Sequence, residues 1–208
     1  MKRSITLALA AAAITAMTGC GSSSSTSRTA FTGALVDSGV QGVTYFCGGK
    51  TGVTGANGHF DCTTAPVSFS LGTITLGTID AITSDYLVFP QDIVGVPRTQ
   101  VNGVVTNMAI LFQSLDSDGD PTNGITIAPA TVALLNSTTS PLNITNYTPT
   151  SMEALVGNIV ADAVTAGFGS LMNVVTADQA LANLALTVET PPPSPTQPGA
   201  STGSSGGI

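Results

Sequence analysis

The sequence has little charge and few of the side chains that catalysis and nucleic-acid binding use most. Its 208 residues include no tryptophan, a single histidine (His59) and only 8% charged residues, whereas charged residues make up about 25% of typical soluble domains. Only five basic residues stand against twelve acidic ones. Because binding through phosphate contacts needs clustered lysine and arginine, the composition excludes a nucleic-acid partner.

Motifs typical of enzymes and zinc sites are also absent. The chain has no CxxC or Cys/His cluster, and its G-x-S-x-G matches, at 199–203 and 203–207, lie in the low-complexity tail and not in the strand-to-helix elbow that a nucleophile needs. His59 and Asp61 lie two residues apart in a predicted strand and would share one face, but no nucleophile motif accompanies them. We therefore predict a non-enzymatic protein. A pair of glycosidase-type carboxylates stays open as an alternative, since such pairs come together only in the fold.

The one long apolar run lies at the start of the chain. Two basic residues precede residues 5–16, a run that suits the export machinery and is too short to span a bilayer. The tetrapeptide MTGC follows at 17–20. Together these features resemble a bacterial lipoprotein signal peptide with a lipobox, which implies cleavage before Cys20 and acylation of that residue. The alternative is an ordinary secretory signal that leaves Cys20 as a free thiol.

The lipobox resemblance also implies a cellular location. The residue after the cysteine is Gly21 and not aspartate, which by resemblance to Gram-negative lipoproteins favours the outer membrane. Anchoring there leaves Cys47 and Cys62 as an even pair in an oxidising compartment, so we predict that they form a disulfide. The alternative is two small buried hydrophobic residues in adjacent strands.

Residues 30–82 carry strand signals. Asn57-Gly58 is a hairpin turn signal, and residues 67–71 alternate between apolar side chains and serine. The stretch GALVDSGVQGVTYFCGGKTGVTGANGHFDC, with a T-x-x-x-G-x-F turn from Thr54 to Phe60, resembles the start of a Cna-B-like or transthyretin-like β-sandwich module. The resemblance implies a spacer or stalk module of bacterial surface proteins.

Helical patterns follow residue 83. A helix is predicted over 102–115 and a short one over 130–135, and two capping-box pairs, Thr150 with Glu153 and Thr176 with Gln179, open two more. The first helix carries an apolar stripe that is either a core face or a partner groove, and the core face is the usual case. This stripe comprises Val104, Val105, Met108, Leu111, Phe112 and Leu115.

Residues 115–125, LDSDGDPTNGI, carry an L-D-x-D-G-x-P-x-N-G-I signature. The signature and the capped helix after it resemble a recurring region of proteobacterial exported proteins, described as adhesin-like or as uncharacterised lipoproteins. The resemblance implies an architecture more than an activity.

The same stretch is a candidate calcium site. Asp116, Asp118 and Asp120 alternate directly after a helix, and Asn123 follows closely. Calcium requires oxygen ligands packed into a tight loop, and carboxylates at a helix C-terminus otherwise oppose the helix dipole. The loop departs from an EF-hand, because proline stands where the loop needs glycine. The alternative is a solvated turn whose side chains bond their own backbone.

We therefore predict an α+β fold in which a small β-sandwich module precedes a small helical domain. The predicted function is a structural or adhesion module tethered to the membrane by its lipid, with an envelope or surface protein or a glycan as partner. The alternative is a ligand-binding lipoprotein with a cleft between the two parts. A binder should present an apolar pocket with convergent polar groups, and an interaction module an exposed apolar patch or a free sheet edge.

The predicted divisions are a signal peptide at 1–19, a flexible tether at 20–29, the β module at 30–82, the helical domain at 83–190 and a disordered tail at 191–208.

Overall fold

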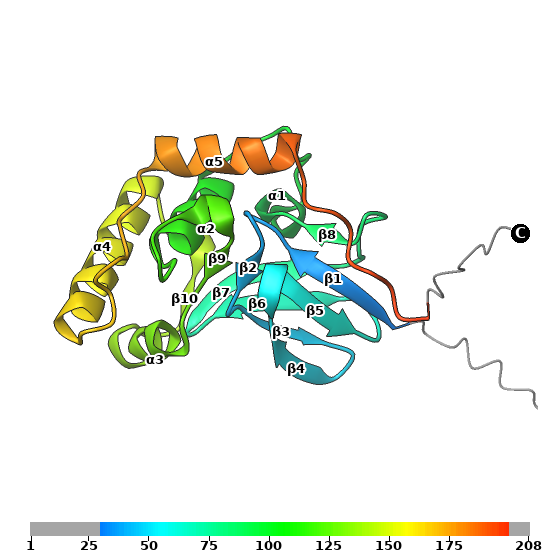
Figure 1. Cartoon of the computed structure of the whole chain (residues 1–208), viewed down its shortest axis with the longest axis horizontal. Helices are drawn as coiled ribbons and strands as arrows, with labels where there is room; N and C mark the ends of the chain where they lie inside the picture. The colour runs from blue at the N-terminus through cyan, green and yellow to red at the C-terminus, as the bar shows by residue number, and fades with distance from the viewer. Residues whose placement is uncertain (1–29, 200–208) are drawn as a thin grey trace, which may run out of the picture.

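The computed structural model describes residues 30–199, so the signal peptide, Cys20 and the tether lie outside the described residues. The described chain is α+β, as predicted (Figure 1). Its strands are β1 (Phe31–Leu35), β2 (Val40–Gln41), β3 (Thr44–Cys47), β4 (Lys50–Val53), β5 (His59–Cys62), β6 (Val67–Leu71), β7 (Ile74–Ile79), β8 (Leu87–Val88), β9 (Ile125–Thr126) and β10 (Leu142–Asn143). Its α-helices are α1 (Pro90–Val94), α2 (Gly103–Ser114), α3 (Pro129–Thr138), α4 (Pro149–Thr165) and α5 (Ala177–Glu189).

The strands form one sheet in the order β5-β1-β8, a second in the order β10-β7-β6-β3-β4, and a two-stranded pair of β2 and β9. The two larger sheets contact one another through aromatic rings. The Phe60 ring of β5 lies 5.4 Å from the rings of both Tyr45 and Phe69, which belong to the second sheet. The predicted alternation in β6 is confirmed, because its apolar residues are buried and its serines are not. Burial of these inner faces supplies the main favourable free energy of the fold.

The Asn57-Gly58 turn takes the backbone conformation expected of it but does not make a hairpin. Both residues have positive φ, 58° and 74°, within a 3-10 turn that joins β4 to β5. These two strands belong to different sheets, since β5 pairs with β1 and β4 with β3. The turn therefore carries the chain from one sheet to the other, and the predicted hairpin is wrong.

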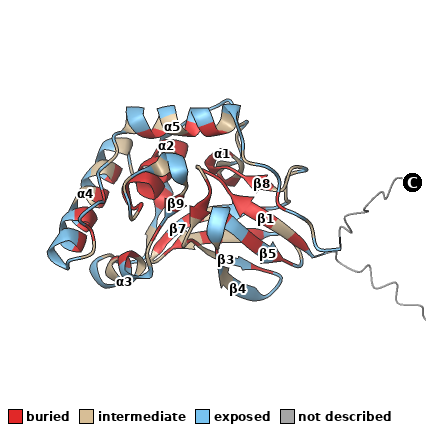
Figure 2. Cartoon of the chain, viewed as in Figure 1, coloured by how far each residue is buried: buried red, intermediate tan, exposed pale blue. Residues whose placement is uncertain are grey.

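Helix α2 is the centre of the helical part. Asn102 caps it, with its side-chain oxygen accepting hydrogen bonds of 3.0 Å from the N–H groups of both Val104 and Val105. Every residue from Val105 to Leu115 is buried (Figure 2), because α1, α4 and α5 pack around the helix. The predicted stripe is therefore core from Val105 onward, with Val104 half-buried, and the other α2 residues from Thr106 to Ser114 are core as well.

The later helices lie close to their predicted positions, but one cap differs. Helix α5 begins with the predicted Thr176 capping box, whereas α4 is capped by Thr148 and Ser151 and not by Thr150 and Glu153. Helix α4 begins at Pro149, a favoured first helical residue because proline has no N–H to satisfy.

The predicted boundary at residue 82 is not a break in strand pairing. Strands β8, β9 and β10 follow it in sequence, yet they pair in parallel with β1, β2 and β7. The buried apolar residues of both halves belong to one contiguous core. The described strands and helices therefore pack as a unit.

Residues 191–199 contain no helix or strand and run beside β1 (Figure 1). The Gln197 side-chain amide accepts a hydrogen bond from the Thr32 N–H (3.2 Å) and donates one to the Thr32 carbonyl (2.9 Å). The described part of the predicted tail is thus attached to the sheet, and residues 200–208 lie outside the described residues.

Candidate functional site

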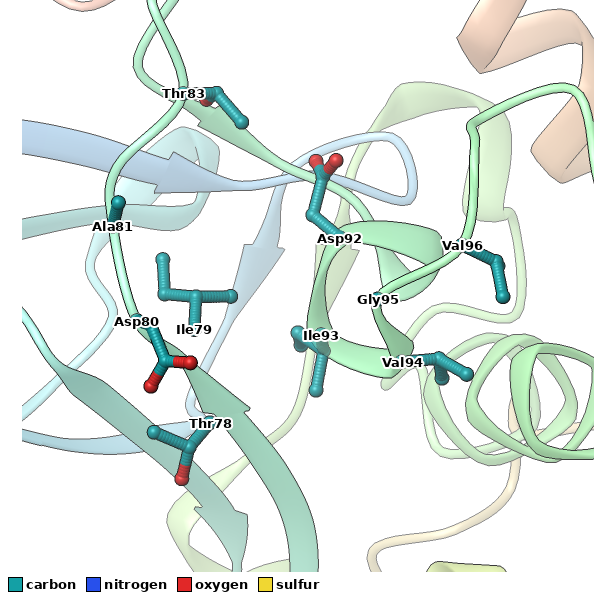
Figure 3. Close-up of a pocket in the computed structure, with 10 residues that line it drawn as sticks. All are labelled: Thr78, Ile79, Asp80, Ala81, Thr83, Asp92, Ile93, Val94, Gly95 and Val96. Atoms are coloured by element: carbon teal, nitrogen blue, oxygen red, sulfur yellow. The ribbon is translucent and has the colours of Figure 1, made fainter.

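An open cleft lies where the β part meets the first helix (Figure 3). The end of β7 and the loop after it form one wall, and α1 with its C-terminal turn forms the other. Its volume is about 530 Å³. Gly95 has a positive φ of 77°, which ends α1 in a left-handed cap and turns the chain back along the wall. The lining residues are Thr78, Ile79, Asp80, Ala81, Thr83, Asp92, Ile93, Val94, Gly95 and Val96.

Arg98 fixes the α1 wall of this cleft. Its guanidinium pairs with Asp85 at 2.6 Å and with Asp92 at 3.0 Å, and it lies 4.3 Å from the centre of the Phe89 ring. The hydrogen bond from Arg98 is the main cause that lowers the pKa of Asp85 to about 2. One of the two carboxylates lining the cleft, that of Asp92, is therefore already occupied by a cation of the chain itself.

The lining of the cleft combines polar and apolar groups. It offers carboxylates, hydroxyls and aliphatic carbons, with no imidazole or thiol. Figure 3 shows the carboxylates of Asp80 and Asp92 pointing in different directions.

His59 and Asp61 lie on the exposed face of β5, so they share a face as predicted. The Asp61 carboxylate accepts a hydrogen bond of 2.6 Å from the Thr32 hydroxyl. His59 lines a separate hollow between β1 and the C-terminal prolines. The Asp61 carboxylate therefore binds a hydroxyl of the neighbouring strand β1, and no hydrogen bond among the described residues joins it to the His59 imidazole.

The predicted disulfide is present. Cys47 and Cys62 are joined, with their Cα atoms 5.9 Å apart, and both residues are buried. Cys47 belongs to β3 and Cys62 to β5, so the bond links the two larger sheets and not neighbouring strands of one sheet.

The acidic turn begins with a buried carboxylate. Asp116 is only 1% exposed, and its Oδ1 accepts a 2.8 Å hydrogen bond from the Thr126 N–H. Its Oδ2 is buried and has no hydrogen-bond partner among the described residues. Burial is the main cause that raises the pKa of Asp116 to about 6, and the neighbouring Asp118 carboxyl adds to the rise.

The other predicted ligands are exposed and bonded within the turn. Asp118 accepts from the Asp120 N–H (3.0 Å) and from the Asn123 side-chain amide (3.1 Å). Asp120 accepts from the Thr122 N–H (3.1 Å). The bonds from the Asp120 N–H and the Asn123 amide lower the pKa of Asp118, and all three bonds are those expected of a self-capped turn. Within residues 30–199, no group of three or more His, Cys, Asp or Glu side chains is arranged to hold a metal.

The structure also contains a buried polar cluster that the sequence did not indicate. Asp37 follows β1 and is 1% exposed. The Gln113 amide of α2 donates to both Asp37 oxygens at 3.1 Å, and Asn183 of α5 donates to Gln113 at 3.0 Å. Burial raises the pKa of Asp37 to about 7. Only the fold brings these three residues together, because they are far apart in the sequence.

Comparison with known proteins gave no match: no family model, curated protein or solved structure is significantly similar to the chain. Among the residues described, no helix has the length and apolar character needed to cross a bilayer.

Proposed function

We propose that the protein is a non-enzymatic outer-membrane lipoprotein, anchored through acylated Cys20, that acts as a structural or adhesion module. The signal peptide and lipobox pattern support the proposed outer-membrane location. A disulfide between two sheets supports it as well, because such bonds persist in oxidising compartments. The likeness to Cna-B-like modules belongs to this proposal, and two sheets in face-to-face contact are compatible with it.

The outer face of the five-stranded sheet is the observation that carries the interaction role. Cross-strand pairing puts Phe46 beside Thr51 and Ser68, and Thr44 beside Val53 and Ser70. Phe46 is 52% exposed and Val53 is 61% exposed. We call this uncharged surface the hydroxyl face; it comprises Thr44, Phe46, Thr51, Val53, Ser68, Ser70, Thr75 and Thr78.

The exposed Phe46 and Val53, and the lack of charge around them, are what the hydroxyl face shares with a contact surface. Interface centres are enriched in aromatic side chains and depleted of charge. The face ends at β4, which pairs only with β3 among the described strands, so the outer edge of β4 offers backbone groups to a partner strand. An exposed apolar patch and a free edge are the two features expected of an interaction module. The proposed partner is an uncharged envelope surface, either protein or glycan.

The test is affinity capture with the full chain, purified in detergent, as bait for envelope proteins and glycans. A Phe46→Ser/Val53→Ser variant removes the apolar centre of the hydroxyl face. Leu186→Ser on α5 is the matched control, since Leu186 is equally exposed at 62%. We expect the double variant to lose partners that the control retains. If both variants capture the same partners as the wild type, the hydroxyl face is not the interaction surface.

A second candidate function is ligand binding in the cleft of Figure 3. The cleft lies between β7 and α1, at the junction that this alternative requires. Asp80 is the cleft carboxylate that Arg98 does not hold, so a cationic or polyhydroxyl ligand fits best. Thermal melts with a panel of sugars and polyamines test this function. Stabilisation that Asp80→Asn abolishes would favour it over the interaction role.

A further inference from the structure

The Asp116 carboxylate is buried without enough hydrogen-bond donors for both of its oxygens. One of its oxygens is buried without any donor, and such an atom costs free energy comparable to a lost hydrogen bond. The adjacent carboxyl group is that of Asp118, which carries the same charge. Both residues follow the C-terminus of α2, where the helix dipole also disfavours negative charge. The oxygen without a donor, the neighbouring carboxylate and the helix dipole would therefore all be offset by a positive charge bound beside Asp116.

The described chain does not supply that charge. Lys50 and Arg98 are the basic residues in 30–199. Arg98 is bound to Asp85 and Asp92, and the ion pairs of the described residues include neither Asp116 nor Asp118. Among residues 30–199 the source of that charge is therefore a proton or a cation from solution.

The turn is shaped so that its oxygens stay together. The Thr126 N–H holds one oxygen of Asp116, and the Asn123 amide and the Asp120 N–H hold Asp118. Gly119 has a positive φ of 73°, and a side chain there would collide with the Leu171 carbonyl. The turn is thus fixed between β9 and the segment before α5, and it does not need to fold around a ligand.

We propose that the turn 116–123 binds one Ca²⁺ between the unpartnered oxygen of Asp116 and the carboxylate of Asp118. Oxygen is the only ligand type these side chains offer, and Ca²⁺ completes six to eight positions with carbonyls and water. Magnesium fits less well, because it demands octahedral geometry and dehydrates reluctantly. Two carboxylates define a weak site with a Kd of about 0.1–1 mM, in the range of extracellular calcium modules.

The experiment is calorimetric titration and thermal melting of the full chain in detergent at pH 7.5, with calcium chloride and, in parallel, magnesium chloride. We expect heat of binding with calcium. At ten times its Kd, calcium should raise the folded-to-unfolded ratio about elevenfold. No heat and no rise in Tm with 10 mM calcium would overturn the proposal, and so would an equal response to magnesium.

Two variants assign the site. In Asp116→Asn the new amide can donate to Asp118, so we expect a higher Tm without calcium and no response to calcium. Asp162→Asn, at an exposed position on α4, should respond as the wild type does. If Asp116→Asn keeps the calcium response, the cation is bound elsewhere and the assignment is wrong. Loss of the site would leave the hydroxyl face untouched, so the two proposals fail independently.

Discussion

At the scale of single residues, carboxyl groups with shifted pKa values determine how the protein responds to pH. Asp37 is buried, whereas Asp85 is partly exposed. Asp37 and Asp85 show opposite cases. Asp85 gains a guanidinium partner, and its pKa falls to about 2. Asp37 is buried with only a neutral amide as donor, and its pKa rises to about 7. For Asp37, removal from water outweighs the hydrogen bonds that a neutral amide donates.

We predict that Asp37 makes the protein less stable as the pH rises from about 4 to 7. Its pKa is higher in the folded chain than the ordinary value of 3.8, so within this window the folded state holds a proton that the unfolded state has lost. The free energy of unfolding therefore falls as the pH rises. Urea denaturation of Asp37→Asn at pH 5, 6, 7 and 8 should show a shallower decline than the wild type. Some decline should remain, because Asp116 has a raised pKa of the same sign.

Asp80→Asn is the control for this pH series, since Asp80 lies exposed on the cleft wall. Its profile should match that of the wild type. A wild-type profile that is flat or rises over pH 5–8 would contradict the role given to Asp37.

At the scale of elements, local patterns predicted correctly what depends on neighbours in sequence. The start of α2 close to residue 102 and the capping box of α5 follow from residues within one turn. The burial of α2 on every side did not follow, because it depends on helices far along the chain. Asn107 reads as a surface residue, yet it is fully buried and its amide donates to the carbonyls of Ile144 and Tyr147. The two-residue strands β8, β9 and β10 are too short to show a period.

The cap of α4 gives a prediction with a matched control. The Thr148 side chain accepts a hydrogen bond from the Ser151 N–H, while Thr150 lies inside the helix. Replacing a capping threonine by alanine costs about 1 kcal/mol. We expect Thr148→Ala to lower the free energy of unfolding by that amount in urea titrations, and Thr150→Ala to leave it nearly unchanged. Equal losses in both variants would contradict the assignment of the cap to Thr148, and a larger loss in Thr150→Ala would assign the cap to Thr150.

The disulfide acts between elements, since it joins the two sheets. It closes a loop of 15 residues, which in the chain-entropy model is worth about 3 kcal/mol. We expect Cys47→Ala/Cys62→Ala to lose about that much stability in urea titrations. Reductant should destabilise the wild type and not the variant. Mass spectrometry of the non-reduced wild type that finds both thiols free would remove the basis of this prediction.

At the scale of the whole molecule, the first and last described segments of the chain lie next to each other. Ala30 and Pro198 line the same hollow, and Figure 1 shows the first and last described residues at one end, away from α3 and α4. Residues from both halves of the sequence share one core. This packing was not predictable from the change in composition near residue 82, because pairs such as β1 with β8 depend on the complete fold. The proposed lipid anchor at Cys20 would attach the molecule to the membrane at this end, ahead of Ala30.

That arrangement depends on lipid anchoring at Cys20, which is the last prediction. A single acyl chain binds membranes only marginally, whereas several chains anchor a protein stably. The triacylated protein should therefore fractionate with membranes and show the mass of its lipid. We expect Cys20→Ala to release the chain into the soluble fraction, and Ser22→Ala, two residues along, to remain membrane-bound. If the Cys20→Ala protein stays with the membranes while the wild type has an unmodified mass, another feature holds the protein there and the anchor is not at Cys20.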